Sequence, residues 1–68
     1  MFEVTTNGER VEVEALPCPL DQFLIDQGFF PKSVVVELNG EAVSPSEFPN
    51  HTVNDQDRLE IVRIVAGG

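Results

Sequence analysis

A chain of 68 residues with a single cysteine has to hold its fold together by packing alone. An intramolecular disulfide needs a second cysteine, and one Cys with one His cannot supply the four ligands of a structural zinc site. Domains of this size bury little apolar surface and usually need such support. The apolar fraction of 41%, which includes five Phe, is adequate for a packed core. We therefore predict one small domain without covalent or metal cross-links.

The first 14 residues are typical of a β-hairpin. Two alternating runs, Phe2–Thr6 and Arg10–Glu14, flank the pair Asn7-Gly8. Asn-Gly between alternating runs favours a type I′ turn, because both central residues of that turn need a positive φ. The side chains expected to face the core are Phe2, Val4, Val11 and Val13. Those expected to face water are Glu3, Glu12 and Glu14.

A short helix follows the segment Pro17-Cys18-Pro19. Pro19 suits the first helical position, where a missing N–H does no harm. Gly28 suits a left-handed residue that ends the helix. The helix is therefore predicted from about Pro19 to Gln27. Its apolar stripe consists of Leu20, Phe23 and Leu24.

The remaining elements complete the pattern of a known fold class. A central strand is predicted at Ser33–Leu38, followed by an Asn-Gly turn at Asn39-Gly40 and a short edge strand at Glu41–Val43. A capped helical turn at Ser44–Phe48 and a second turn at Asn54–Asp57 then lead to the last strand, Arg58–Val65. A hairpin, one helix and further strands predict an α+β architecture. The order is that of a β-grasp, or ubiquitin-like, fold, in which one main helix packs across a mixed sheet.

Toward its end, the last strand no longer places apolar residues on the inward side and polar residues on the outward side. Leu59 and Ile61 point inward, and the same period carries Arg63 inward and turns Val62 and Ile64 outward. Either a bulge resets the phase, or the strand leaves the core near Val62. A bulge predicts ordinary burial of both apolar side chains. Departure from the core exposes them on one face, which predicts a partner-binding surface.

The sequence closes on Ala66, Gly67 and Gly68. Glycine loses the most backbone freedom when it is ordered, so stability does not require two of them here. A terminal Gly presents a carboxylate without a Cβ, on an arm slender enough to enter a narrow channel of another protein. Activation as an acyl-adenylate makes that carboxylate reactive toward sulfur or amine nucleophiles. We therefore predict a β-grasp domain over residues 1–65 and a flexible tail over residues 66–68.

These features resemble the ThiS family of small sulfur carrier proteins of thiamine biosynthesis, in the ThiS/MoaD superfamily. The resemblance rests on the element order, on the stretch VVVELNGEAVSPSEF and, most specifically, on DQDRLEIVRIVAGG. One difference is Gln56, because the family often has Gly between the two aspartates of the closing turn. The resemblance places Gly68 at the reacting end, Ala66 and Gly67 in the tail, and Val62 and Ile64 in the docking surface.

The resemblance also implies a reaction sequence. A ThiF-like adenylyltransferase uses ATP to adenylate the Gly68 carboxylate, and a sulfur donor system converts the adenylate to a thiocarboxylate. A ThiG-like thiazole synthase then takes the sulfur for the thiazole ring. The carrier itself binds no cofactor, because ATP is used by the activating enzyme.

Other functions remain open from sequence. A carrier for molybdopterin synthase has the same fold and terminus but is generally longer, so 68 residues favour the thiazole pathway. A ubiquitin-like modifier would join Gly68 to lysines of other proteins. A plain β-grasp binding module would use no terminal chemistry. An enzyme is not expected, since the sequence has no recognisable nucleophile–base pair, metal-ligand set or P-loop.

Charge and composition limit the partners. The net charge of −8 repels phosphate backbones and anionic lipids and attracts a basic surface, so we expect neither nucleic acid nor membrane as a partner. The single Cys and the absence of a signal-peptide pattern favour a cytoplasmic location.

Three polar positions could indicate chemistry of their own. Cys18 stands at the predicted helix N-cap, where a thiolate is stabilised, but carrier chemistry places the sulfur at the terminus. His51 has no partner motif and is interpreted as a surface residue. Asp55 and Asp57 lack the ligand spacing of a calcium loop and are interpreted as a solvated turn.

Overall fold

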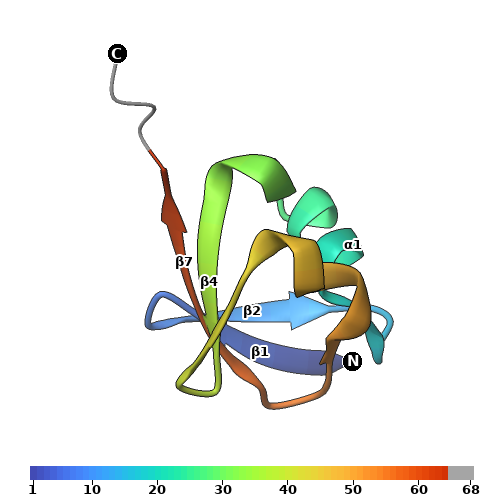
Figure 1. Ribbon diagram of the computed structural model, residues 1–68. Coiled ribbons are helices and arrows are strands. Elements are labelled where there is room, and N and C mark those ends of the chain that lie inside the picture. Colours follow the sequence, from blue (N-terminus) through green and yellow to red (C-terminus); the bar gives the residue numbers. More distant parts are fainter. Residues whose placement is uncertain (65–68) are drawn as a thin grey trace.

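The computed structural model describes residues 1–64, which form a five-stranded mixed sheet crossed by one main helix (Figure 1). The strands lie in the spatial order β2 (Glu9–Val13), β1 (Phe2–Thr6), β7 (Arg58–Arg63), β4 (Val34–Leu38) and β5 (Glu41–Val43). The helical elements are α1 (Leu20–Asp26), η1 (Pro31–Ser33) and η2 (Pro45–Asn50). This arrangement confirms the predicted α+β fold with a β-grasp element order. Within residues 1–64, no helix is both long and apolar enough to cross a bilayer.

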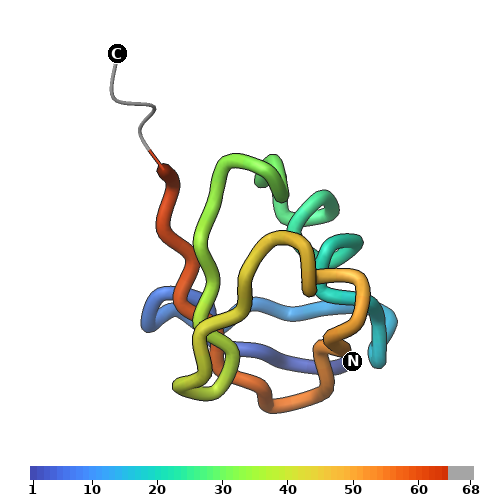
Figure 2. Tube along the Cα trace, in the orientation of Figure 1, coloured from blue at the N-terminus to red at the C-terminus, as the bar shows by residue number. Residues whose placement is uncertain are grey.

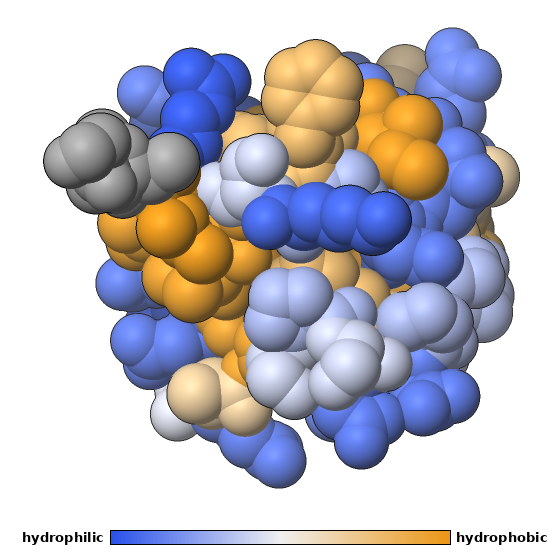
Figure 3. Space-filling view, turned by 45° about the horizontal axis from the view of Figure 1, so that its top comes forward, coloured by the Kyte–Doolittle hydropathy of each residue, from blue (hydrophilic) through white to orange (hydrophobic). Residues whose placement is uncertain are grey.

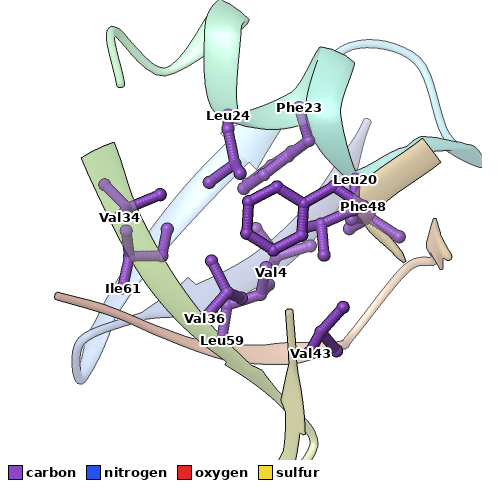
Figure 4. Close-up of a cluster of buried hydrophobic side chains, with 11 residues drawn as sticks. Val4, Leu20, Phe23, Leu24, Val34, Val36, Val43, Phe48, Leu59 and Ile61 are labelled. Carbon is purple, nitrogen blue, oxygen red and sulfur yellow. The ribbon is translucent and has the colours of Figure 1, made fainter. Parts of the chain in front are cut away.

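The core lies between the sheet and α1 (Figure 4). The helix contributes the predicted stripe, and η2 adds Phe48, which is also buried. The buried apolar residues are Val4, Leu20, Phe23, Leu24, Val34, Val36, Val43, Phe48, Val53, Leu59 and Ile61. Val11 and Val13 of β2 are half-buried against this cluster. All the fully buried side chains among the described residues are apolar, so apolar packing forms this core.

The helix ends as the sequence predicts. Gly28 has a φ of +87°, its N–H bonds to the carbonyl of Ile25 at 3.0 Å, and the N–H of Phe29 bonds to that of Leu24 at 2.9 Å. These two bonds form a Schellman motif, which satisfies carbonyls that the last turn leaves open. The chain therefore leaves α1 with Phe29 directed back toward the core margin.

The helix begins differently from the prediction. Pro19 is the N-cap residue rather than the first helical residue, with an extended φ and ψ of −61° and 145°. Cys18 and Pro19 form the short strand β3, which pairs with β6 (Thr52–Val53) in a second, two-stranded sheet. The N–H of Leu20 donates to the carbonyl of His51 at 2.9 Å. Strands of two residues have too short a period to be recognised from sequence.

Asparagine side chains in both hairpin turns bind β7. Asn7 and Asn39 have φ values of 50° and 53°, as the type I′ turns require. The Asn7 amide accepts a bond of 2.7 Å from the Ile61 N–H and donates one of 3.0 Å to the Ile61 carbonyl. The Asn39 Oδ1 accepts a bond of 2.9 Å from the Arg58 N–H. The turns therefore hold the central strand as well as reversing the chain.

The Asn7 contact lengthens a very short strand pairing. β1 pairs with β7 in parallel only through Thr5↔Arg58 and Thr6↔Leu59. The Asn7 side chain then occupies the place of the next strand residue and satisfies both backbone groups of Ile61. Beyond Ile61, β7 continues beside β4 alone.

The turn before β7 contains a residue in a strained conformation. Gln56 has a φ of +70°, a region that costs a residue with a side chain about 1 kcal/mol or more. The conformation is retained because the Gln56 N–H donates to the Glu3 carbonyl at 2.6 Å and Asp57 Oδ2 accepts from the Asn54 N–H at 2.8 Å. Asp55 similarly accepts the Glu3 N–H at 2.8 Å. Gln56 therefore adopts the left-handed conformation that glycine usually occupies.

Replacing Asn7 with Gly separates the turn from the strand contact. Asn7→Gly keeps the positive φ that the turn needs but removes both hydrogen bonds to Ile61. Since each part-buried bond contributes about 1 kcal/mol, we expect a loss of about 1–2 kcal/mol in the free energy of unfolding, measured in urea. A variant as stable as the wild type would show that the Asn7 side chain does not hold β7.

Replacing Gln56 with Gly should have the opposite effect. Gln56→Gly relieves the left-handed strain and keeps the N–H that bonds to Glu3, so we expect a gain of about 0.5–1 kcal/mol in urea unfolding. The matched control is Gln27→Gly at the end of α1, where φ is −88° and no strain exists. That control should be destabilised by up to about 1 kcal/mol. Destabilisation by both changes would contradict the strain argument.

Candidate functional site

The C-terminal half of β7 runs past the end of β1 and stays paired with β4 alone. Its register with β4 is continuous from Leu38↔Leu59 to Val34↔Arg63, so no bulge resets the alternation. The Ile64 N–H donates to the Ser33 carbonyl at 2.8 Å and extends the pairing by one residue. Figure 2 shows this end of the strand rising beside β4 and beyond β1.

The unbroken alternation exposes two apolar side chains. Leu59 and Ile61 are 0% and 4% exposed, whereas Val62 and Ile64 are 57% and 50% exposed. Of the two readings left open by the sequence, departure from the core is therefore confirmed and the bulge is wrong. The resemblance predicts that both residues belong to a docking surface, and the structure leaves them accessible for that role.

A third residue belongs to this surface and was missed. Val35 lies directly opposite Val62 in the β4–β7 register and is 45% exposed. Val35, Val62 and Ile64 together are called the sheet-face patch below. Figure 3 shows apolar side chains gathered on this side of the molecule. The run Val34-Val35-Val36 gave a signal, because alternation turns one of its members away from the core, but only the register shows which residue it meets.

Arg63 takes the inward position beyond the end of the core. Its guanidinium lies over the Phe29 ring, with Cζ 5.4 Å from the ring centroid, and the residue is exposed. A guanidinium stacked on an aromatic face keeps contact with water while its plane covers apolar surface. This arrangement explains how a charged residue can follow Leu59 and Ile61 on the same side of the strand.

Beside the sheet-face patch, the open face of the sheet has a shallow hollow. Its apolar lining includes Val35, Ala42, Pro45 and Val62, and two carboxylate residues, Glu37 and Glu60, complete it. A second, polar hollow adjoins the first and shares both glutamates. Charge and apolar surface are therefore adjacent on the face that carries Val62.

The predicted reacting end follows this surface directly in sequence. Val65, Ala66, Gly67 and Gly68 lie outside the described residues. The domain end at residue 65, the tail over residues 66–68 and the role of Gly68 therefore stay predictions. Ile64, the last described residue, marks where that segment begins.

Cys18 is not placed for thiolate chemistry. It precedes the N-cap residue Pro19 and is half-buried against the core, so the prediction that it occupies the N-cap is wrong. Burial raises the pKa of the Cys18 thiol, and the carboxylates of Asp26 and Asp21 raise it further. The thiol is therefore protonated at neutral pH and a poor nucleophile.

The other polar candidates serve the fold. The carbonyl of His51 accepts the Leu20 N–H, and Asp55 and Asp57 accept backbone N–H groups of the closing turn and of β1. Across residues 1–64, no three His, Cys, Asp or Glu side chains lie close enough to hold a metal ion.

Solved structures share this fold. The crystal structure of the thiamine biosynthesis protein ThiS from Geobacter metallireducens superimposes with a TM-score of 0.82 and 31% identity, over 97% of this chain and 99% of that one. The solution NMR structure of a thiamine biosynthesis protein from Geobacter metallireducens gives a TM-score of 0.79, also at 31% identity, over 97% of this chain and 87% of that one. The likeness confirms the β-grasp fold.

Two relatives match by sequence. A thiazole synthase from Magnetococcus marinus is 31% identical over 67 residues, which is 98% of this chain but only 20% of that protein. A protein of Pyropia yezoensis named Uncharacterized protein ycf40 is 37% identical over 68 residues, and the match covers 98% of this chain and 93% of that protein. The chain therefore spans about a fifth of the first relative and nearly all of the second.

The family model agrees with the structural likeness. The model described as "ThiS family" matches residues 2–68, which is almost the whole chain and includes the exposed end of β7 and the closing glycines. This chain therefore belongs to the ThiS family.

Proposed function

We propose that this protein is a sulfur carrier of thiamine biosynthesis whose Gly68 carboxylate is the reacting group. A ThiF-like enzyme adenylates that carboxylate with ATP, and a ThiG-like thiazole synthase receives the sulfur. The observation that carries the proposal is the exposed sheet-face patch on β7, which stands directly before the Ala66-Gly67-Gly68 segment of a ThiS-family chain. A partner that grips the patch would have the reacting segment next to it.

The chemistry requires little of the carrier beyond its end. The carboxylate attacks the α-phosphate of ATP and releases pyrophosphate, which leaves an acyl-adenylate. A persulfide sulfur then attacks the acyl carbon and AMP leaves. A second thiol cleaves the resulting sulfur–sulfur bond, so that one sulfur stays on the acyl carbon as a thiocarboxylate. All groups that promote these steps would belong to the partners, which agrees with a carrier rather than an enzyme.

The absence of side chains at Gly67 and Gly68 suits this role. A narrow active-site channel can admit two glycines where residues with a Cβ would collide with its walls. Because the glycines have no side chains to bind a partner, the docking surface provides the apolar area for affinity. Val62 and Ile64 each offer a half-exposed aliphatic side chain whose burial would favour association.

The thiazole synthase relative supports the choice of acceptor. A ThiS-like stretch occupies about a fifth of that longer protein, which is named for thiazole formation. Direct sulfur transfer from the carrier to the synthase would favour having both in one chain. The molybdopterin and protein-conjugation alternatives have no comparable support.

Sulfur loading tests the proposal. The protein is incubated with the ThiF-like enzyme, ATP and a sulfur donor, and we expect an intact-mass gain equal to exchange of one oxygen for one sulfur. Deletion of Gly68 should abolish this gain without changing the unfolding midpoint, because the described core does not include that residue. Cys18→Ser should load fully. Loading that requires Cys18, or that survives loss of Gly68, would contradict the proposal.

The docking role of β7 is tested separately. The double change Val62→Ser and Ile64→Ser should weaken binding to the ThiF-like enzyme about tenfold or more, because apolar anchors dominate such interfaces. Ile25→Ser is the matched control, since Ile25 is 54% exposed on α1 and lies away from β7. Equal affinities for the control and the double variant, measured by calorimetry, would count against docking at this surface.

A further inference from the structure

Two glutamates oppose each other on the open face of the sheet. Glu37 of β4 and Glu60 of β7 are direct cross-strand partners, two residues along the strands from the pair Val35↔Val62. Both carboxylate residues are exposed. Like charges at directly opposite positions destabilise a sheet, so this pair works against the fold.

Among residues 1–64, no salt bridge reaches this pair. The ion pair found there joins Arg10 to Glu3 at 3.7 Å, on the same face but in the β1–β2 hairpin at the other edge of the sheet. Arg58 lies two residues before Glu60 and lines the polar hollow with both glutamates, but no salt bridge joins it to either in the described part of the chain. The Asn39 side chain, opposite Arg58, bonds to the β7 backbone and to Asp57 instead.

The hairpin contains an instructive contrast. Glu3 and Glu12 are also direct cross-strand partners. There, however, Arg10 of the same hairpin reaches Glu3, so part of the repulsion is offset. The Glu37–Glu60 pair differs because no salt bridge joins it to a cation and because it borders the sheet-face patch.

The surroundings of the pair define the shape of a ligand. On one side lies the apolar hollow with Val35, Ala42, Pro45 and Val62, and on the other lies the polar hollow. Glu37 and Glu60 line both. A side chain that fits this junction needs an apolar stem followed by a positive head, which is the shape of arginine or lysine.

We propose that the Glu37–Glu60 pair is the receptor for an arginine of the activating enzyme. The aliphatic stem of that arginine would lie in the apolar hollow against Val35 and Val62, and its guanidinium would lie between the two carboxylates. Arginine is favoured over lysine because its planar fork can bond to two carboxylates at once and loses less hydration on binding. The inference rests on the proposed function only for the identity of the partner.

The overall charge agrees with this partner. A net charge of −8 on 68 residues draws a basic surface toward the protein before contact is made. The sheet-face patch alone would accept any apolar surface of suitable shape. The charged pair would add a condition on the partner, since an apolar or acidic group placed there would leave both carboxylates without compensation.

The test compares two isosteric changes. Glu60→Gln removes both the repulsion with Glu37 and the proposed receptor. Glu12→Gln removes the same net charge from the hairpin pair Glu3–Glu12, which Arg10 reaches. We expect Glu60→Gln to raise the melting temperature by about 2 °C and to weaken binding to the ThiF-like enzyme about three- to fivefold. Glu12→Gln should leave that affinity within about 1.5-fold of the wild type. The salt dependence of binding should also be smaller for Glu60→Gln.

Greater stability together with weaker binding for Glu60→Gln, and not for Glu12→Gln, supports the receptor. If the wild type is adenylated and Glu60→Gln binds as tightly as Glu12→Gln, the receptor is overturned and the proposed function stands. If the wild type is neither bound nor adenylated by the enzyme, the proposed function fails and this inference fails with it. A lower melting temperature for Glu60→Gln would show that repulsion between Glu37 and Glu60 does not destabilise the sheet.

Discussion

The structure depends on a central strand, β7, that has to serve two environments along its length. Its first half lies between β1 and β4, and Leu59 and Ile61 on its inner face reach the core. Its second half is paired with β4 alone. Two hairpin asparagines secure the first half: Asn7 bonds to Ile61 and Asn39 to Arg58. With that half held, the remaining residues can extend past β1, and their pairing with β4 keeps their direction defined.

Strict alternation along β7 turns this geometry into a functional surface. A bulge would have buried Val62 and removed the patch, whereas the regular register presents Val62 beside Val35 on the face away from α1. The same regularity carries Arg63 to the helix side, where the Phe29 ring accommodates it. The stability of the inner half and the exposure of the outer half therefore follow from one backbone geometry, not from two separate adaptations.

Local signals predicted most of the fold. The Asn-Gly pairs, the apolar stripe of α1 and the left-handed Gly28 each act within a few residues, so their effect can be read without knowing the rest of the chain. The strand β3 with its partner β6 could not be predicted, because two residues have no useful period and their pairing joins segments far apart in sequence. For the same reason Cys18 was wrongly placed at the helix N-cap. The left-handed conformation of Gln56 could not be predicted either, because it is held by a backbone bond to Glu3, which is distant in sequence.

The sequence by itself determined the type of each main element, the resemblance to sulfur carriers and the two alternatives for the last strand, since these depend on periodicity and on short motifs. Only the tertiary structure decided between the alternatives, because exposure depends on where neighbouring strands end. It alone paired Val62 with Val35 and Glu37 with Glu60. Such pairings depend on the register between strands distant in sequence, which long-range packing sets and no local pattern encodes.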